Sequence, residues 1–214
     1  MSTLRVEKME LGPIATNAFL LWDEKGNGEA VLIDAPPSAR ETVQSILNRE
    51  RLAIRSIWLT HGHWDHMGGV DDFDTKEMEI VGHRDDQIMY EQPEIMSTFA
   101  IPGLDLKPVQ ISHWVEHGEE LDLLGRKVEV RHCPGHCPGN VIFWMEKEER
   151  CFVGDVIFAG SVGRSDLPGG DFKTLERSIR KEVYTLPENT MIHPGHGPDT
   201  SVGVEMKSNP FVRS

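Results

Sequence analysis

Four side chains able to bind a metal ion fall within six residues of this 214-residue chain, at His61, His63, Asp65 and His66. They follow an apolar segment, Ile54–Leu59, whose pattern predicts a buried strand. On one helix these positions would scatter around the axis, so a single helical face cannot present all four. We therefore expect a tight turn at the end of a strand, from which the four side chains converge on two neighbouring points.

Three further candidate ligands occur in the same local setting, each just past an apolar strand and beside glycines or prolines: His136, Asp155 and His196. Imidazole and carboxylate donors without a thiolate favour zinc, iron or manganese, and zinc is the expected choice. Seven ligands suit two divalent metal ions that share one carboxylate.

The order of apolar segments predicts a layered α/β fold that is neither a doubly wound sheet nor a barrel. Strands are expected at Leu4–Leu11, Asn17–Trp22, Ala30–Ile33, Ile54–Leu59, Glu79–Val81, Glu120–Leu124, Lys127–His132, Val141–Met145, Arg150–Val153 and Met191–His193. Helices are expected at Ser38–Arg51 (with Ser38 as N-cap), Arg84–Tyr90, Thr174–Val183 and Thr200–Lys207, and a long loop at Gln92–His117. No repeat or linker divides the chain, so we expect one domain over residues 1–214.

Composition limits the classes of partner. The chain has 22 Lys and Arg against 35 Asp and Glu, a net charge of −13, which disfavours nucleic acid as a partner. No apolar run is long enough to cross a membrane, and the first residues lack the apolar stretch of a signal peptide, so we expect a cytoplasmic protein. Three cysteines are too few for a disulfide framework, and Cys133 and Cys137 are expected to be buried turn residues rather than a separate thiolate metal site.

The ligand string and the stretch Gly154–Asp171, which contains Leu167-Pro168-Gly169-Gly170-Asp171, resemble the metallo-β-lactamase-fold hydrolases, and within them the short glyoxalase II-like (hydroxyacylglutathione hydrolase-like) branch. The resemblance implies an αβ/βα four-layer sandwich of two mixed sheets with helices outside. It also implies a ligand set: His61, His63 and His136 for a first metal, Asp65, His66 and His196 for a second, and Asp155 bridging both.

The resemblance further implies a metal-dependent hydrolase that cleaves a small-molecule thioester such as S-lactoylglutathione through a hydroxide bridging the metals, with Asp65 orienting that hydroxide. Two alternatives stay open: a persulfide dioxygenase with a single iron, and a lactonase or other ester hydrolase. True metallo-β-lactamases are disfavoured, because Asp155 is present and no cysteine is needed as a ligand. Eighteen residues follow His196, so we expect weak discrimination between thiol portions. Arg164 and Asp166 are expected either to contact substrate or to form an internal ion pair.

Overall fold

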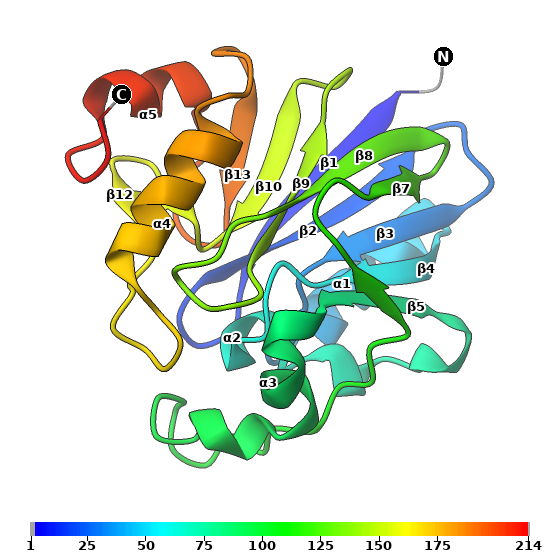
Figure 1. Cartoon of the computed structure of the whole chain (residues 1–214). Coiled ribbons are helices and arrows are strands. Elements are labelled where there is room, and N and C mark those ends of the chain that lie inside the picture. Colours follow the sequence, from blue (N-terminus) through cyan, green and yellow to red (C-terminus); the bar gives the residue numbers. More distant parts are fainter. Residues whose placement is uncertain (1–2, 214) are drawn as a thin grey trace. The chain divides into compact units, whose positions relative to one another are not determined.

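The computed structural model describes residues 3–213; Met1, Ser2 and Ser214, although part of the domain expected over 1–214, lie outside the described residues. The chain, drawn as a ribbon in Figure 1, divides into two compact units. Within the described residues, unit 1 comprises residues 3–82 and 87–114, and unit 2 comprises residues 83–86 and 115–213. The two units are described one at a time, and the single domain stays a prediction.

The sheet based in unit 1 has six strands in chain order: β1 (Leu4–Leu11), β2 (Thr16–Asp23), β3 (Glu29–Ile33), β4 (Ala53–Trp58), β5 (Glu79–His83) and β6 (His113–Val115). The β1–β2 and β2–β3 pairs are antiparallel hairpins, and β3–β4 and β4–β5 are parallel. Every residue of β2 from Thr16 to Trp22 is buried, which is the burial expected of a strand covered on both faces.

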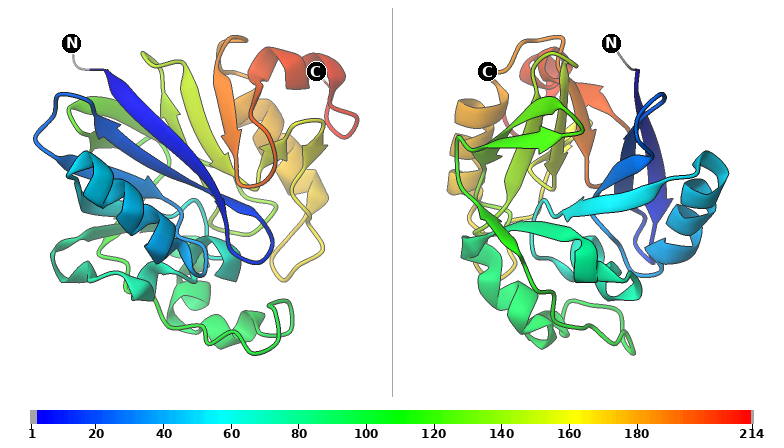
Figure 2. Two further views of the ribbon diagram at one scale, coloured as in Figure 1. Left: turned by 180° about the vertical axis from the view of Figure 1, so that it is seen from behind. Right: turned by 90° about the vertical axis from the view of Figure 1, so that its right-hand side faces the viewer.

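Helix α1 (Ala39–Glu50) makes the crossover from β3 to β4 and lies along this sheet (Figure 2). It buries Val43, Ile46 and Leu47, the helical spacing that predicted it. Ser38 does occupy the N-cap position, but its φ is 66° and its side chain makes no capping hydrogen bond. The expected capping role of Ser38 was therefore wrong.

Unit 2 contains the second six-stranded sheet, in the order β14 (Thr200–Ser201), β13 (Met191–Pro194), β10 (Arg150–Gly154), β9 (Val141–Met145), β8 (Arg126–His132) and β7 (Glu120–Leu123). Only β10 and β13 pair in parallel among these described strands. Two mixed sheets with helices confirm the α/β class, and the described strands close no barrel.

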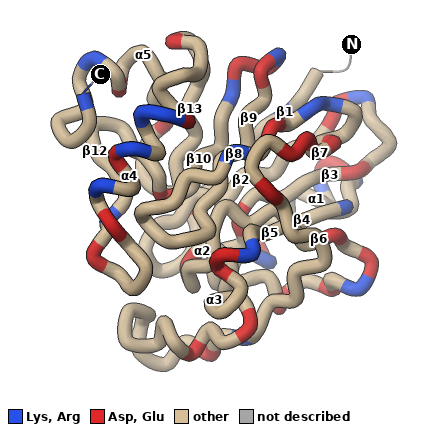
Figure 3. The backbone as a smooth tube through the Cα atoms, viewed as in Figure 1, with Lys and Arg blue, Asp and Glu red and all other residues tan. Residues whose placement is uncertain are grey.

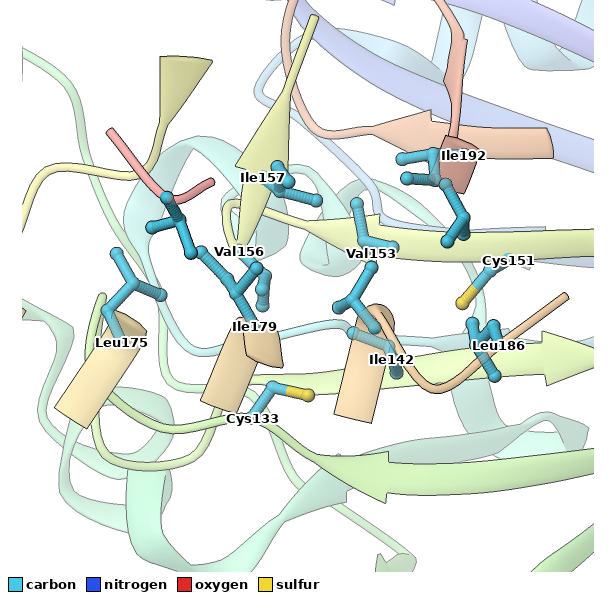
Figure 4. Close-up of a cluster of buried hydrophobic side chains, with 13 residues drawn as sticks. Cys133, Ile142, Cys151, Val153, Val156, Ile157, Leu175, Ile179, Leu186 and Ile192 are labelled. Carbon is cyan, nitrogen blue, oxygen red and sulfur yellow. The ribbon is translucent and has the colours of Figure 1, made fainter. Parts of the chain in front are cut away.

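One apolar cluster holds unit 2 together (Figure 4). Helix α4 (Phe172–Ser178) continues directly into a π-helical turn, Ile179–Val183, and the two together occupy the predicted helix at Thr174–Val183. Leu175 and Ile179 from this helix pack with Val153 and Ile142 from the sheet, and all four side chains are fully buried. The same cluster contains Cys133 and Cys151, which behave here as small apolar side chains.

Short elements account for most differences from the expected pattern. A hairpin of β11 (Ile157–Phe158) and β12 (Ser161–Val162) was not predicted, and the expected loop Gln92–His117 ends in strand β6. The last helix, α5, spans Val202–Ser208 and begins after β14. The remaining short elements are helices α2 (Trp64–Met67) and α3 (Gln87–Glu91) and 3-10 turns at Val70–Asp72, Thr75–Glu77, Arg84–Asp86 and Pro93–Met96.

Acidic and basic residues are interspersed along the backbone (Figure 3). Among the helices of residues 3–213, none is both long and apolar enough to span a bilayer.

Candidate metal centre

The residues after β4 that carry the first four candidate ligands form a short loop and then a single helical turn. His61 lies in the loop, His63 occupies the N-cap of α2, and Asp65 and His66 lie on α2 itself. All four side chains are buried. The predicted tight turn is present, although its second half is helical.

Two pairs of ligand atoms in unit 1 have the spacing of neighbouring metal ligands. The Nε2 atom of His61 lies 3.1 Å from Nδ1 of His63. The Oδ2 atom of Asp65 lies 3.3 Å from Nε2 of His66. Two ligands of one tetrahedral ion, each bound at about 2.0–2.1 Å, lie about 3.3 Å apart. Each pair therefore fits one divalent ion in both distance and donor type.

Asp34, which follows β3, fixes the orientation of these rings. Its carboxylate accepts hydrogen bonds from the Thr60 backbone N–H (2.8 Å), the Thr60 hydroxyl (2.8 Å) and Nδ1–H of His66 (2.7 Å). The Thr60 hydroxyl in turn accepts from Nδ1–H of His61 at 3.0 Å. Since both Nδ1 atoms carry the proton, the Nε2 lone pairs of His61 and His66 are the ones available to an ion. Asp34 was missed by sequence reasoning, because its only signal was a carboxylate directly after an apolar strand.

The other three predicted ligands lie together in unit 2. One carboxylate oxygen of Asp155, Oδ2, lies 3.5 Å from Nε2 of His136 and 3.6 Å from Nε2 of His196. Nδ1–H of His136 donates to the carbonyl of Arg164 at 2.7 Å, so its Nε2 atom carries the lone pair. His136 and Asp155 are buried, whereas the His196 side chain is 26% exposed. A single carboxylate oxygen close to two imidazole nitrogens is compatible with a carboxylate that two ions share.

Two glycines permit these close approaches. A Cβ at Gly163 would lie 1.8 Å from the carbonyl oxygen of Asp155 and 3.1 Å from Nδ1 of His136. Gly135 has a φ of 130°, and a Cβ there would lie 2.2 Å from the backbone nitrogen of Leu175. Because no side chain fits at either position, the backbone can pack directly against the ligand-bearing turns.

The structure thus brings four predicted ligands together in unit 1 and three in unit 2, while their assignment to a first and a second ion stays a prediction. The cysteines are free and buried, as expected. Burial raises the pKa of the Cys133 and Cys137 thiols well above the ordinary value.

Arg164 and Asp166 form the expected ion pair, with Nε and Oδ1 2.8 Å apart. Both side chains are largely exposed, so the expectation of an internal pair was wrong. The hydrogen bond from Arg164 lowers the pKa of Asp166 to about 2.

Comparison with known proteins adds independent evidence. Residues 11–196 match the family described as the metallo-beta-lactamase superfamily. The chain is 35% identical to the protein named hydroxyacylglutathione hydrolase GloC of Haemophilus influenzae, over 99% of both chains. Among solved structures, it is similar to BLEG-1 B3 metallo-beta-lactamase, with 36% identity over 98% of this chain and 100% of that one and a TM-score of 0.89. It is also similar to TTHA1623 in a di-iron-bound form, with 37% identity over 97% of this chain and 100% of that one and a TM-score of 0.83.

Proposed function

Because this chain belongs to the metallo-beta-lactamase superfamily and is a metal-dependent hydrolase of that fold, we propose that it hydrolyses small thioesters of the glyoxalase II type, S-lactoylglutathione among them. One observation carries the thioester class: 35% identity, over 99% of both chains, to a hydroxyacylglutathione hydrolase. Within each unit, nitrogen and oxygen donor atoms lie at about the distance expected between ligands of one ion, which supports the metal dependence. Small-molecule thioesters are then the partners, with no role for nucleic acid or membrane, and the cytoplasm is the proposed location.

The proposed ligand set follows the family resemblance. One ion would be held by His61, His63 and His136. The other would be held by Asp65, His66 and His196, and Asp155 would bind both ions. When bound, two divalent ions would lower the pKa of a coordinated water towards about 7 and polarise the thioester carbonyl. Zinc suits these donors, and iron is the metal of the di-iron-bound neighbour TTHA1623.

The residues of the chain supply orientation and proton handling. Asp65 accepts a hydrogen bond from the Thr16 hydroxyl at 2.9 Å, which fixes its carboxylate beside His66. In that position the Asp65 carboxylate would orient the attacking water. The leaving thiolate needs no general acid, because a thiol with a pKa of about 8.5 departs readily near neutral pH.

Metal content tests the proposed centre. Purified protein saturated with zinc is expected to hold two ions per chain, and Asp155→Ala is expected to lose both ions and activity together, since one carboxylate serves both. Asp71→Ala, at an exposed position of unit 1, is the matched control and keeps its metal. If Asp155→Ala kept two ions and normal turnover, the ligand assignment would be wrong.

A substrate panel tests the reaction class. The metal-loaded enzyme is assayed with S-lactoylglutathione, an acyl-coenzyme A, a simple lactone and a chromogenic β-lactam, and oxygen uptake is followed with glutathione persulfide. We expect turnover of the thioesters with little discrimination between thiol portions and a KM near about 1 mM, the upper part of the usual range. Oxygen uptake without thioester turnover, at defined iron loading, would replace the hydrolase with the dioxygenase.

β-Lactam hydrolysis is the second candidate, because the similar protein BLEG-1 is named a B3 metallo-beta-lactamase. A β-lactam turned over faster than every thioester would favour it. Preferential lactone turnover would keep the metal chemistry and change the substrate class.

A further inference from the structure

Two histidines outside the proposed ligand set each stand at the start of a ligand-bearing turn in unit 2. His132 ends β8, four residues before His136. His193 lies in β13, three residues before His196. Neither matches a metal-ligand pattern in the sequence.

Each of these histidines closes the turn that follows it. Nε2–H of His132 donates to the carbonyl of Pro138 at 2.7 Å. Nδ1–H of His193 donates to the carboxylate of Asp199 at 2.9 Å. Both hydrogen bonds join residues six positions apart, and both enclose a proposed ligand. We call the pairs His132–Pro138 and His193–Asp199 the two clasps.

An aromatic ring fixes the plane of each clasp histidine. His83 stacks on His132 with ring centroids 4.1 Å apart and planes inclined by 17°. Phe152, opposite His193 in the β10–β13 register, stacks on it at 4.8 Å and 21°. The stacked faces stop each imidazole from turning out of line with its acceptor.

The surrounding donors and acceptors fix the tautomers. A carbonyl oxygen carries no proton, so the hydrogen bond to Pro138 requires the His132 proton on Nε2. Arg150 Nη1 donates to Nε2 of His193 at 2.9 Å, which leaves the His193 proton on Nδ1, facing Asp199. Each clasp therefore uses a different ring nitrogen.

A metal role for His132 does not fit the geometry. Asp85 Oδ2 lies 3.6 Å from Nε2 of His132 and 3.9 Å from Nδ1 of His83, a cluster with metal-like donors. An imidazole binds an ion in the plane of its ring, along a nitrogen lone pair. The His83 and His132 rings are nearly parallel and stacked, so an ion shared between them would lie well out of both planes. The His132 Nε2–H is moreover committed to Pro138.

We propose that His132 and His193 are positioning residues that hold the turns of His136 and His196 ready for metal binding. The proposal rests on the proposed metal centre. A turn closed before the ion arrives loses less conformational freedom on binding, so opening a clasp weakens affinity. Because His136 and His196 are assigned to different ions, each clasp acts mainly on one ion.

The two donor atoms predict opposite patterns of rescue. A glutamine side-chain nitrogen falls near the Nε2 position of histidine, and an asparagine nitrogen falls near Nδ1. His132→Gln should therefore preserve its clasp, and His132→Asn should open it. At His193 the order reverses, since His193→Asn can reach Asp199 and His193→Gln cannot.

The test is zinc titration of metal-free wild type and of the four variants. We expect His132→Asn and His193→Gln each to lose about 10- to 100-fold in affinity for one of two ions, and a different one in each case. His132→Gln and His193→Asn should stay near wild type. His113→Gln, which removes a partly exposed imidazole paired with Glu79 in another part of the chain, is the control and should have no effect.

Amide hydrogen exchange in the metal-free proteins supplies a second readout that needs no ion. Faster exchange is expected within residues 133–139 for His132→Asn and within 194–199 for His193→Gln. Equal loss at both ions, or equal loss for the Asn and Gln variants at one position, would overturn the proposal. If wild type bound no zinc, the proposed function would fail. The clasps would be refuted separately by unaltered amide exchange in both opened variants, whether or not zinc binds.

Discussion

The Asp34 carboxylate accepts three hydrogen bonds within unit 1, and it does so from a backbone conformation that few residues adopt. Its φ is 59°, in the left-handed region where asparagine and aspartate are the most tolerated residues after glycine. It connects the strand that it follows to the ligand loop through Thr60 and to the helix α2 through His66. Asp34 is not among the proposed metal ligands, but it orients the ring of His66, which is.

Asp34→Asn isolates this role, because asparagine keeps the backbone conformation and nearly the same volume. One acceptor oxygen becomes an NH₂ group that faces existing donors, so His66 loses the partner that orients its ring. We expect zinc affinity to fall about 10- to 100-fold while the folded structure is retained. Titration with circular dichroism as the folding check measures both.

Asp105→Asn, at an exposed position that pairs with Lys107, is the control for the loss of one negative charge and should bind zinc normally. Unchanged zinc affinity in Asp34→Asn would show that the carboxylate does not orient His66.

The reactivity of the three thiols is the second prediction at the scale of single residues. Burial raises the pKa of Cys133, Cys137 and Cys151, and Cys137 donates its S–H to Asp86 at 3.2 Å. Thiolate is the reactive form, so native protein should react negligibly with a disulfide reagent at pH 8, and unfolded protein should show three thiols. The double variant Cys133→Ser, Cys137→Ser should keep its metal content, and loss of metal would restore the separate thiolate site.

Local chemistry was enough to pick out the candidate ligands, whereas the residues that orient them could not be picked out in this way. Four ligands within six positions leave few structural explanations, so the string was visible without a fold. The hydrogen-bond partners of Asp34, His132 and His193 lie 26, 6 and 6 positions away in the chain, respectively. These contacts form only when the fold brings the end of a strand against the partner's turn. Single polar residues of this kind carry no local pattern.

At the scale of elements, the N-terminus of α4 depends on one carboxylate. Asp171 accepts from the Thr174 backbone N–H at 2.7 Å, and hydrogen bonding to Thr174 lowers the pKa of Asp171. A carboxyl whose pKa is lowered by folding stabilises the folded state above its unfolded pKa of about 3.9. That contribution is lost as the pH falls through the lower pKa of the folded state.

Asp171→Ala should therefore lower the Tm at pH 7 by about 2–4 °C, and the difference from wild type should shrink as the pH falls below about 4. Asp171→Asn keeps a capping oxygen and should lose less at pH 7. Calorimetry at several pH values measures the differences. Asp74→Ala is the matched control, because Asp74 is also an N-cap residue but makes no capping hydrogen bond. An equal Tm loss at the control position would remove the explanation by capping.

The elements that sequence reasoning found are those with a clear apolar period. Val141–Met145 was predicted to the residue, and β1 likewise. The β11–β12 hairpin was missed because each strand has two residues, too few to show alternation. Ser38 had the sequence of an N-cap, but the turn after Pro36 and Pro37 places it in a left-handed conformation in which its hydroxyl caps nothing.

At the scale of the whole molecule, the net charge follows directly from the sequence. The chain carries −13 at pH 7, with acidic and basic residues interspersed along the backbone (Figure 3). Two bound divalent ions would bring the net charge only to −9. An anionic substrate approaching the protein is therefore repelled overall, and this repulsion acts over the Debye length.

The salt dependence of catalysis should reveal this repulsion. Raising the ionic strength from about 0.01 M to 0.15 M shortens the Debye length from about 30 Å to about 8 Å. For S-lactoylglutathione, whose glutathione portion carries carboxylates, kcat/KM should rise about twofold or more, because screening weakens repulsion during encounter. A neutral N-acetylcysteamine thioester is the control and should show a flat profile, which separates encounter from any effect of salt on the enzyme itself. A fall in kcat/KM confined to the anionic substrate would mean that a local cationic surface governs its approach, with the exposed Arg164 guanidinium the first group to substitute.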